Sequence, residues 1–576
     1  MTPRRAVLAA LLAFVAVNLL FLGARPVLTA DETRYGSIAA QMAESGDWMQ
    51  LRMSGFRFYE KPPLTYWMTA ASIKAFGHTG FAIRLPAALC GGLAALAVGV
   101  AARRGARLAG SAPPDATVTG ALVALASLTM VLPAVGSSVA ILDMPIAGLA
   151  LAASCAFFVA VTGERGRPRL AWLAVSGVFA GLAFMTKGLL AVVLPASALV
   201  PWLVWERRWR DLLAAPWAVL AVGALVVLPW AVAVTAAEPG FWTRFIVHEH
   251  FQRFTGSGSN QPRESTFFYF LIVPLGCVPW IVAAPAAAAG AVWGIRAQSG
   301  LRFALCALVG PFVFLSLSRG KLPTYALPCF APAAWLIVAG LLEAFGRRAA
   351  VQGERVRSRW ADAPGLVLLA LGGGALALAL SGDAGAALLG RAWLSHPHAH
   401  AAVLAAVLVL WGIGDLLAQR ARTAPGRIAL MGLSPVAALA SFGLLFPDAA
   451  LDDALATGPS IERERTALVS AGTLFCDQKL AHASAWFLDR TDFLVVDRPR
   501  EFANGQGVPE DDARLVGDAQ FAARLAEARG RGSAAIAAAT PIVDRLLRAQ
   551  GVPTPSRRVD FRGWALAEFP CSAPLH

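Results

Sequence analysis

Long apolar stretches alternate with short polar segments from the N-terminus to about residue 447. Most of these stretches are long enough to cross a bilayer as an α-helix, which needs about 20 residues. Fourteen of them are helix candidates: 6–24, 64–78, 83–101, 117–135, 140–161, 170–185, 188–205, 215–236, 267–291, 301–317, 323–343, 363–381, 399–419 and 427–446. The pattern therefore predicts a polytopic α-helical membrane protein.

Clusters of arginine between the apolar stretches decide which candidates cross the membrane. The clusters are Arg4-Arg5, Arg103 to Arg107, Arg165 to Arg169, Arg207 to Arg210, Arg296 to Arg302, Arg347 to Arg359 and Arg420 to Arg427. Basic residues favour the cytoplasmic side. If the short segment 64–78, which follows Pro62-Pro63, lies along the interface, thirteen helices cross and every cluster is cytoplasmic. We therefore expect about thirteen transmembrane helices, an uncleaved first helix, a cytoplasmic N-terminus and a C-terminus outside.

The composition changes after residue 447, where charged residues and mixed periodicity replace the apolar runs. Strand-like Phe493 to Val496 and the helix-like run 510–530 predict a small α/β domain outside the membrane. We expect a transmembrane domain at 1–447, with outer loops at 25–82, 136–143, 237–266 and 318–323, and the α/β domain at 448–576. Cys476 and Cys571 are the two cysteines outside the apolar stretches, and we hypothesise that they pair in an oxidising compartment.

The overall composition supports a membrane protein and explains its positive charge. The 576 residues are 57% hydrophobic and 15% charged, whereas soluble domains are about 45–50% apolar and about 25% charged. The formal net charge is +14, but only five of the 50 basic residues are lysine. Arginine-rich cytoplasmic loops account for this excess. We therefore expect membrane lipids as partners and no nucleic acid.

The expected topology places several polar motifs on the outer face. They are Asp31 to Gly36, Tyr59 to Leu64, Leu142 to Pro145, Thr186 to Gly188, His248 to His250 and Arg319 to Pro323. Lys61, Lys187 and Lys321 lie there against the positive-inside trend, which suggests that they bind an anion. Each cation taken singly can instead snorkel to the interface. An ordinary solvated loop is likewise the simplest explanation of an isolated Asp-Glu pair.

Acidic and basic residues in these motifs suit the chemistry of a phosphate group. Asp31 and Glu32 begin a predicted short helix, where capping explains one of the two carboxylates. Asp143 stands in an otherwise apolar run and is costly there without a partner or a task. Lysine suits a phosphate as a point charge and arginine as a bidentate fork. The candidate phosphate ligands are Lys61, Lys187, Lys321, Arg34 and Arg253.

Six motifs, in this order, resemble those of the 4-amino-4-deoxy-L-arabinose lipid A transferases, which belong to the GT-C group with the protein O-mannosyltransferases. They are Asp31 to Tyr35, Tyr59 to Trp67, Ala82 to Pro86, Leu142 to Pro145, Phe184 to Gly188 and Arg319 to Tyr325. The resemblance covers roughly residues 1–345 and beyond that rests on architecture alone. It implies transfer of aminoarabinose from undecaprenyl phosphate to a lipid A phosphate, on the periplasmic face of a Gram-negative inner membrane.

The resemblance also implies residue roles. Asp31 and Asp143 would be the acidic pair at the reaction centre. The substrate-binding residues would be Glu32, Arg34, Tyr35, Tyr59, Lys61, Arg84, Lys187, Arg253, Lys321 and Tyr325. Glu60 and His250 match positions where the family can hold a divalent metal, such as zinc, magnesium or manganese. Two ligands are fewer than the three or four usual for zinc. No other cofactor is expected besides the lipid donor, and we expect a monomer.

Breaking a sugar–phosphate bond develops positive charge at the anomeric carbon and negative charge on the departing phosphate. Carboxylates near the first and cations near the second stabilise this transition state. A phosphate acceptor is already ionised and needs no base, whereas a Ser or Thr hydroxyl would require Asp31 as a general base. We expect inversion at the anomeric carbon, because no separate nucleophile is placed for a double displacement.

Two alternatives stay open at this point. A related polyprenyl-phosphate-sugar transferase, similar to a protein O-mannosyltransferase, would keep the fold and use another sugar or acceptor. The motifs around Asp31 and Lys61 do not distinguish this enzyme from a lipid A aminoarabinose transferase. A transporter of a lipid-linked sugar would instead show repeated halves and ionisable groups near the midplane. The sequence has no internal repeat, and its polar motifs lie at one face.

Overall fold

The computed structural model describes residues 1–58, 60–238, 240–243, 245–246, 264–352, 363–381, 397–444, 456–497, 502 and 509–572. The chain folds into two compact units. Unit 1 comprises Met1–Leu22, Arg84–Leu388 and His396–Leu445. The described residues of unit 2 belong to Gly23–Ile83 and Phe446–His576.

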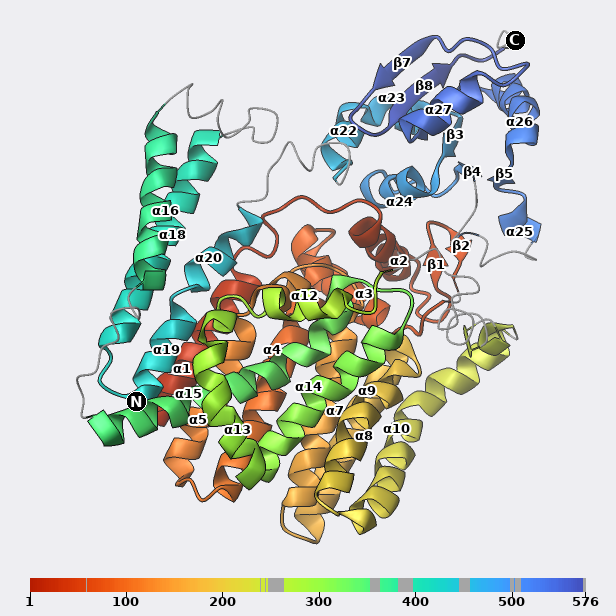
Figure 1. The fold of residues 1–576 in the computed structure, drawn as a ribbon. Coiled ribbons are helices and arrows are strands. Elements are labelled where there is room, and N and C mark those ends of the chain that lie inside the picture. The colour runs from red at the N-terminus through yellow and green to blue at the C-terminus, as the bar shows by residue number, and fades with distance from the viewer. Residues whose placement is uncertain are drawn as a thin grey trace. The chain divides into compact units, whose positions relative to one another are not determined.

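Unit 1 is built from helices (Figure 1). Its first half contains α1 (Pro3–Phe14), the π-helical turn η1 (Val15–Leu19), α4 (Gly80–Leu108), α5 (Pro113–Leu128), α6 (Val131–Ser137), α7 (Asp143–Thr162), α8 (Arg167–Lys187), α9 (Leu190–Trp205) and α10 (Trp209–Ala237). Its second half contains α12 (Phe268–Gly276), η3 (Trp280–Ala283), α13 (Ala284–Ala297), α14 (Ser299–Leu317), η4 (Pro323–Cys329), α15 (Phe330–Gln352), α16 (Ala363–Leu380), α18 (Pro397–Arg420), α19 (Ala424–Leu433), α20 (Val436–Ala440) and η6 (Ser441–Gly443).

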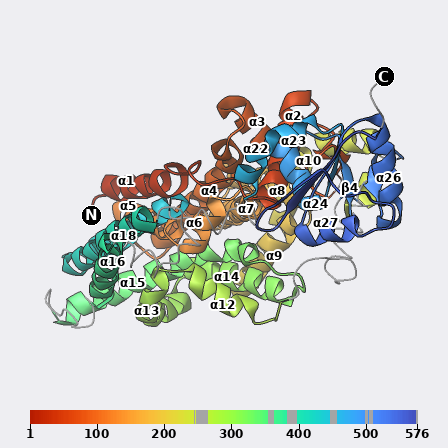
Figure 2. The ribbon, with the colours of Figure 1, turned by 90° about the horizontal axis from the view of Figure 1, so that it is seen from above.

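Helix α7 is the innermost helix of this unit, since every one of its residues is buried. It packs against α8 and α9, and α8 packs in turn against α10. Helices α16 and α18 lie side by side, as Figures 1 and 2 both show, and α18 also packs against α19 and α20. Large apolar side chains such as Leu213 and Leu225 on α10 are exposed, as expected where a helix faces lipid.

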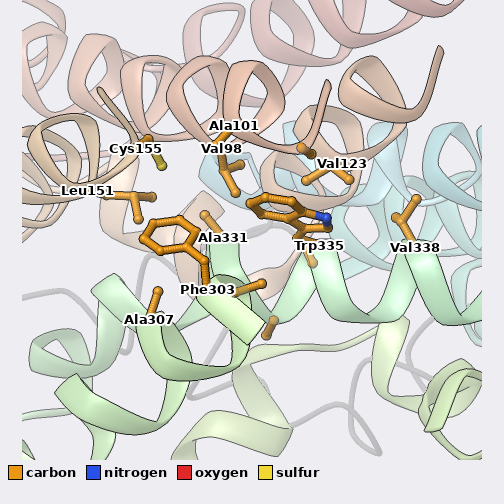
Figure 3. Close-up of a cluster of buried hydrophobic side chains, with 14 of the residues drawn as sticks. Val98, Ala101, Val123, Leu151, Cys155, Phe303, Ala307, Ala331, Trp335 and Val338 are labelled. Carbon is orange, nitrogen blue, oxygen red and sulfur yellow. The ribbon is translucent and has the colours of Figure 1, made fainter. Parts of the chain in front are cut away.

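Two features of the core bring the helices close together. A Cβ atom added at Gly290 of α13 would lie 2.4 Å from the carbonyl oxygen of Gly340 in α15, so this contact requires a residue without a side chain. Aromatic rings from α7, α14 and α15 pack against one another in the core. Phe158 lies 4.6 Å from Phe303, centroid to centroid, and 5.9 Å from Trp335. Figure 3 shows Phe303 and Trp335 among small residues such as Ala101 and Ala331.

The prediction of a polytopic helical membrane protein is confirmed, but the count of thirteen spans is not. In the described part of the chain, ten helices are long and apolar enough to cross a membrane. The count becomes eleven if α5 and α6, which are bent by 71°, form one span. Helix α9, with 16 residues, and α1, with 12, are shorter than these spans. The segment at 64–78 forms α3 (Leu64–Phe76), which has 13 residues and is not among them.

Unit 2 contains a six-stranded mixed sheet with the strand order β5-β4-β3-β6-β8-β7. The strands are β3 (Thr473–Cys476), β4 (Leu494–Val496), β5 (Leu515–Val516), β6 (Ala534–Ala538), β7 (Arg557–Asp560) and β8 (Ala565–Phe569). Strands β3 to β6 are parallel, with Phe475 opposite Ile536, and β8 joins them antiparallel to β6. The helices around them are α22 (Gly458–Arg463), α23 (Arg465–Ser470), α24 (Gln478–Phe487), α25 (Pro509–Asp512), α26 (Asp518–Arg531) and α27 (Thr540–Leu547). The expected α/β domain is therefore present.

The same unit includes residues 23–83, which the sequence assigns to the outer loop 25–82 of the transmembrane domain. They form α2 (Asp31–Ser45), the hairpin of β1 (Arg52–Met53) and β2 (Phe56–Arg57), and α3. Ser54 and Gly55 have φ values of 52° and 83°, which suit a tight two-residue hairpin turn. Helix α2 packs against both α3 and α24. The outer loop and the C-terminal domain thus fold as one unit.

The hypothesis that Cys476 pairs with Cys571 is wrong for this structure. Cys476 is a free, fully buried thiol in β3, with its Sγ 3.8 Å from the Ser484 hydroxyl of α24. The sulfur is therefore buried where β3 meets α24. The domain is held by apolar packing around Phe475, Phe521 and Ile536 instead.

Candidate active site

The first polar cluster lies in unit 1 and begins with Asp143. Asp143 is the first residue of α7, after Leu142 at the N-cap position, and its side chain is 8% exposed. A carboxylate is favoured at the N-terminal end of a helix, where backbone N–H groups lack partners. The helix N-terminus alone does not balance the negative charge of a carboxylate that is almost buried. The structure provides its counter-charge from the next helix along the chain.

Lys187 is that counter-charge. It is the last residue of α8, where a cation is favoured at the C-terminal end of a helix. Its Nζ donates a hydrogen bond to Oδ1 of Asp143, and its side chain is 13% exposed. Because α7 and α8 are consecutive, packed helices, the start of one lies beside the end of the other. Asp143 and Lys187 were both predicted site residues, and the structure brings them together.

The start of η4 completes this cluster. Thr324 donates a hydrogen bond from Oγ1 to Oδ2 of Asp143. The ring of Tyr325 lies against the Lys187 ammonium, with 4.9 Å between Nζ and the ring centroid, a cation–π contact. Tyr325 was predicted as a substrate-binding residue, whereas Thr324 was not. Its place in the motif Arg319 to Tyr325 was the available signal.

Two other predicted substrate ligands of unit 1 are engaged with the backbone. Lys321 is 3% exposed, and its Nζ donates to the carbonyl oxygens of Ser318 and Glu264. Burial lowers the pKa of its ammonium below the ordinary lysine value, while the Glu264 carboxylate acts in the opposite direction. Arg84 is fully buried and donates from Nη1 to the carbonyl oxygen of Leu22 at 2.9 Å. We interpret both as residues that hold the backbone.

The second cluster lies in unit 2 at the start of α2, where the Asp-Glu pair separates. Glu32 is fully buried and forms two 2.9 Å contacts with the guanidinium of Arg25. It also accepts a 2.9 Å hydrogen bond from the Leu28 backbone N–H. A carboxylate with these partners orders the entry into α2. The structure therefore shows a structural role for Glu32, whose predicted contact with substrate stays a prediction. Its partner Arg25 was not among the predicted residues.

Asp31 has the opposite environment. Its side chain is 68% exposed, and Oδ1 lies 3.8 Å from Nη2 of Arg34. The residue before it, Ala30, has a φ of 78°, a strained conformation for a residue with a side chain. Strain of this kind needs support from the surroundings. The Ala30 backbone N–H donates to the Thr33 hydroxyl at 3.2 Å, which helps to hold the turn that presents Asp31.

Arg34 and Tyr35 follow Asp31 on the same helix. Arg34 is partly buried and donates to the Tyr35 hydroxyl, with its guanidinium 4.4 Å from the ring centroid of Tyr35. The Tyr35 ring lies 6.1 Å from that of Tyr66 in α3. The predicted residues Asp31, Arg34 and Tyr35 are therefore brought together on one end of α2.

Lys61 and Glu60 lie beside each other in the segment that leads to α3. Nζ of Lys61 donates to the Glu60 carbonyl oxygen at 3.1 Å and lies 4.0 Å from the Glu60 carboxylate. Within the described ranges, no group of three or more His, Cys, Asp and Glu side chains is placed to hold a metal ion. Tyr59, His250 and Arg253, which were also predicted, lie outside the described residues. The metal expected at Glu60 and His250 therefore stays a prediction.

Comparison with known proteins supports a glycosyltransferase. Residues 5–245 match the family described as dolichyl-phosphate-mannose-protein mannosyltransferase, and residues 456–567 match the arabinosyl transferase ArnT, C-terminal domain. The fold is similar to the crystal structure of ArnT from Cupriavidus metallidurans bound to undecaprenyl phosphate. The TM-score is 0.75, with 22% sequence identity over 98% of each chain.

Relatives with higher sequence identity align with nearly the whole chain and are also arabinosyl transferases by name. The chain is 32% identical over 538 residues to the undecaprenyl phosphate-alpha-4-amino-4-deoxy-L-arabinose arabinosyl transferase of Edwardsiella ictaluri, covering 92% of each protein. It is 34% identical over 526 residues to a protein of the same name from Sodalis glossinidius, covering 91% of this chain and 90% of that one. The chain therefore belongs to the family of undecaprenyl phosphate-alpha-4-amino-4-deoxy-L-arabinose arabinosyl transferases.

Proposed function

We propose that this protein transfers 4-amino-4-deoxy-L-arabinose from undecaprenyl phosphate to phosphate groups of lipid A. The observation that carries the proposal is the similarity to arabinosyl transferases over about nine-tenths of the chain. The donor appears in the names of these relatives. The acceptor is proposed because the predicted outer motifs are rich in lysine and arginine, which suits an anionic phosphoglycolipid.

The C-terminal domain favours this reading over a protein O-mannosyltransferase-like enzyme. The match to the mannosyltransferase family ends at residue 245. The match at 456–567 is to a domain of the arabinosyl transferases. The alternative acceptor, a Ser or Thr hydroxyl of a protein, therefore has support from the first half of the chain alone.

The proposed reaction is a single displacement. The bond between the anomeric carbon and the undecaprenyl phosphate oxygen breaks, and its electron pair stays on the departing phosphate. A phosphate oxygen of lipid A supplies the electron pair of the new bond from the opposite face, so the anomeric carbon inverts. The acceptor oxygen is already ionised, so the transfer itself requires no general base.

We assign the basic residues to the negative charge that develops on the departing phosphate and the acidic residues to the positive charge of the sugar. Lys61, Lys187 and Arg34 are the proposed ligands of phosphate oxygens, as cations near the departing group lower the barrier. Asp31 is exposed and is proposed to engage the sugar ammonium or the developing cation. Asp143 is proposed as the second acid. Its carboxylate is paired with the ammonium of Lys187, and each group offsets much of the charge of the other.

Further parts of the proposal concern the setting of the enzyme. We place it in the inner membrane of a Gram-negative bacterium as a monomer, with the N-terminus in the cytoplasm and unit 2 in the periplasm. A divalent metal at Glu60 and His250 stays a proposal, and no step above depends on it. Within the described residues Glu60 lies beside Lys61.

The direct test uses purified full-length protein with the undecaprenyl phosphate-linked aminoarabinose donor. Lipid A and a Ser/Thr-rich peptide are offered as separate acceptors, and the products are analysed by mass spectrometry. We expect a pentosamine on lipid A and none on the peptide. NMR of the product should show the anomeric configuration opposite to that of the donor. A glycosylated peptide would instead support the alternative, and a retained configuration would refute the single displacement.

A further inference from the structure

The Asp143 carboxylate is held by two donors from two different elements. Lys187, at the end of α8, donates to Oδ1, and Thr324, in the first turn of η4, donates to Oδ2. Both side-chain oxygens of Asp143 are therefore used in the described structure. The three residues are separated by 44 and 181 positions in the chain, so the arrangement depends on the folded bundle.

The two hydrogen-bond donors affect the Asp143 carboxylate differently. The ammonium of Lys187 balances the charge of a carboxylate that is 8% exposed, but an ammonium is a point charge on a flexible stem and fixes direction poorly. A carboxylate held by Lys187 alone can rotate about its Cβ–Cγ bond and still keep that contact. A hydrogen bond from Thr324 to the second oxygen removes this freedom. The plane of the carboxylate is then set by the protein.

Thr324 is itself held in place by its position in the chain. Pro323 opens η4 and fixes the backbone φ angle before Thr324. The backbone N–H of Tyr325 donates to the carbonyl oxygen of Leu322 at 3.1 Å, which closes the turn. A β-branched side chain also has few χ1 rotamers. The hydroxyl therefore approaches Asp143 from a rigid segment.

The next residue acts on the other member of the pair. The Tyr325 ring lies against the ammonium of Lys187. One dipeptide thus contacts both Asp143, through Thr324, and Lys187, through Tyr325. Such a bidirectional contact keeps the ion pair in one geometry, which matters where reacting groups must be placed within a fraction of an ångström.

We propose that Thr324 is a positioning residue for the sugar transfer, which orients the Asp143 carboxylate and does not itself touch the substrate. This inference rests on the proposed function. It makes the Thr324 hydroxyl, and not its methyl group, the part of the side chain that the reaction needs.

The test compares Thr324→Val with Thr324→Ser in the purified full-length enzyme. Valine keeps the shape of threonine and removes the hydroxyl, whereas serine keeps the hydroxyl and removes the methyl group. We expect Thr324→Val to lower kcat by roughly 10- to 100-fold, the size of a hydrogen bond to a charged group, with KM for the donor little changed. Thr324→Ser should keep most of the kcat.

Thr186→Val is the matched control. Thr186 is buried next to Lys187, and its hydroxyl donates to the Leu182 carbonyl oxygen at 3.1 Å, within its own helix. Its loss removes a hydroxyl of the same kind without touching Asp143, and should leave kcat within a few-fold of wild type. Equal losses of kcat in Thr324→Val and Thr324→Ser would show that the packing of the side chain matters and not its hydroxyl. A fully active Thr324→Val would show that the reaction does not need the hydroxyl. Either result overturns the proposal.

A substrate-free readout separates this proposal from the proposed function. If the wild type leaves lipid A unmodified, the acceptor is wrong, and a double-mutant cycle of Thr324→Val and Asp143→Asn in thermal unfolding takes the place of the kinetics. Destabilisation by the double variant that falls short of the sum of the single effects would support the contact. Additive effects would overturn it.

Discussion

At the scale of the residue, several charged side chains that are largely buried in unit 1 occur in pairs. Asp143 has Lys187, Asp211 of α10 lies 2.6 Å from Arg169 of α8, and Glu206 lies 2.6 Å from Arg302 of α14. Removing one partner of a buried pair leaves an uncompensated charge, which costs about 3–5 kcal/mol. The pairs therefore restrict which helices can lie side by side.

Asp31 and Glu32 are adjacent in the chain, but we expect Glu32 to stabilise the fold and Asp31 to act in the transfer. Single substitutions test this difference. Glu32→Gln removes the carboxylate charge that is paired with the buried guanidinium of Arg25, so we expect a loss of about 3–5 kcal/mol of stability. Asp31→Asn changes an exposed side chain and should alter stability by less than about 0.5 kcal/mol while lowering transfer activity. Thermal unfolding and activity of both variants are the measurements. An unstable Asp31→Asn, or a stable Glu32→Gln, would contradict the assignment.

At the scale of the element, helix α24 is fixed by a buried cap. Asp477 follows β3 and accepts a 2.8 Å hydrogen bond from the Leu480 backbone N–H through Oδ1. Its other oxygen accepts a 2.7 Å bond from the Ala539 backbone N–H, directly after β6. One carboxylate thus ties the start of α24 to the neighbouring strand of the sheet.

We expect Asp477→Ala to destabilise unit 2 by about 2–4 kcal/mol, because it removes an N-cap and leaves a partly buried N–H group without its acceptor. Thermal unfolding of the full-length protein measures this. Asp492→Ala is the control, since that side chain is 68% exposed in its pair with Arg490 and should change stability by less than about 1 kcal/mol. Equal effects of the two substitutions would show that the cap is unimportant.

Near the end of α2, Glu44 interacts with the like charge of Asp489, which follows α24. Partial burial, followed by the charge and hydrogen bond of Asp489, raises the pKa of Glu44 above its ordinary value of 4.5. The folded state then binds the proton more tightly than the unfolded state, so the contribution of Glu44 to stability falls as pH rises through the raised pKa. Glu44→Gln removes this dependence.

We therefore expect Glu44→Gln to be more stable than wild type at neutral pH, by less than about 1 kcal/mol because solvent screens an exposed group. The difference should vanish as pH falls below the ordinary value of 4.5. Thermal unfolding of both proteins between about pH 4 and 8 tests this. His78, whose pKa burial lowers, titrates in both proteins and cancels in the comparison. A constant difference across the range would contradict the prediction.

The helices were largely predictable from the sequence because apolar periodicity is a local signal. The run 140–161 became α7 and 170–185 became α8, with ends shifted by a few residues. The run 267–291 was predicted as one continuous helix, and this prediction was wrong. The structure divides it into α12, η3 and α13, with Pro274, Pro279 and Pro285 along it. Proline removes a backbone donor and disfavours a continuous helix.

At the scale of the whole molecule, the outer loop 25–82 belongs with the C-terminal domain, and this was not predictable. The Thr29 hydroxyl lies 2.7 Å from that of Thr457, and the Ser54 hydroxyl lies 2.9 Å from Nδ1 of His482. Each pair is separated by 428 residues. No local pattern indicates such contacts. For the same reason the motifs predicted Asp143 and Lys187 as site residues but did not reveal that they pair.

The contact of α2 with α24 offers a test of this shared unit. A Cβ atom at Gly36 would lie 2.9 Å from the ring of Trp486, so we expect Gly36→Ala to destabilise unit 2 by about 1–3 kcal/mol through overpacking. Activity should fall with it, since the same helix carries Asp31. Gly517→Ala is the control, because nothing lies within 4 Å of its added Cβ atom. Thermal unfolding and activity of both variants are compared, and an unaffected Gly36→Ala would contradict the packing.

The central claim is most directly tested by mass spectrometry of lipid A from a host that makes the aminoarabinose donor but lacks its own transferase. Wild type is compared with Asp31→Ala and Asp143→Ala at matched membrane levels. Asp115→Ala is the control, an exposed carboxylate in the first turn of α5. We predict a pentosamine on lipid A with wild type and Asp115→Ala, and none with the other two. Unmodified lipid A from well-expressed wild type would contradict the acceptor, and modification that survives both substitutions would contradict the site.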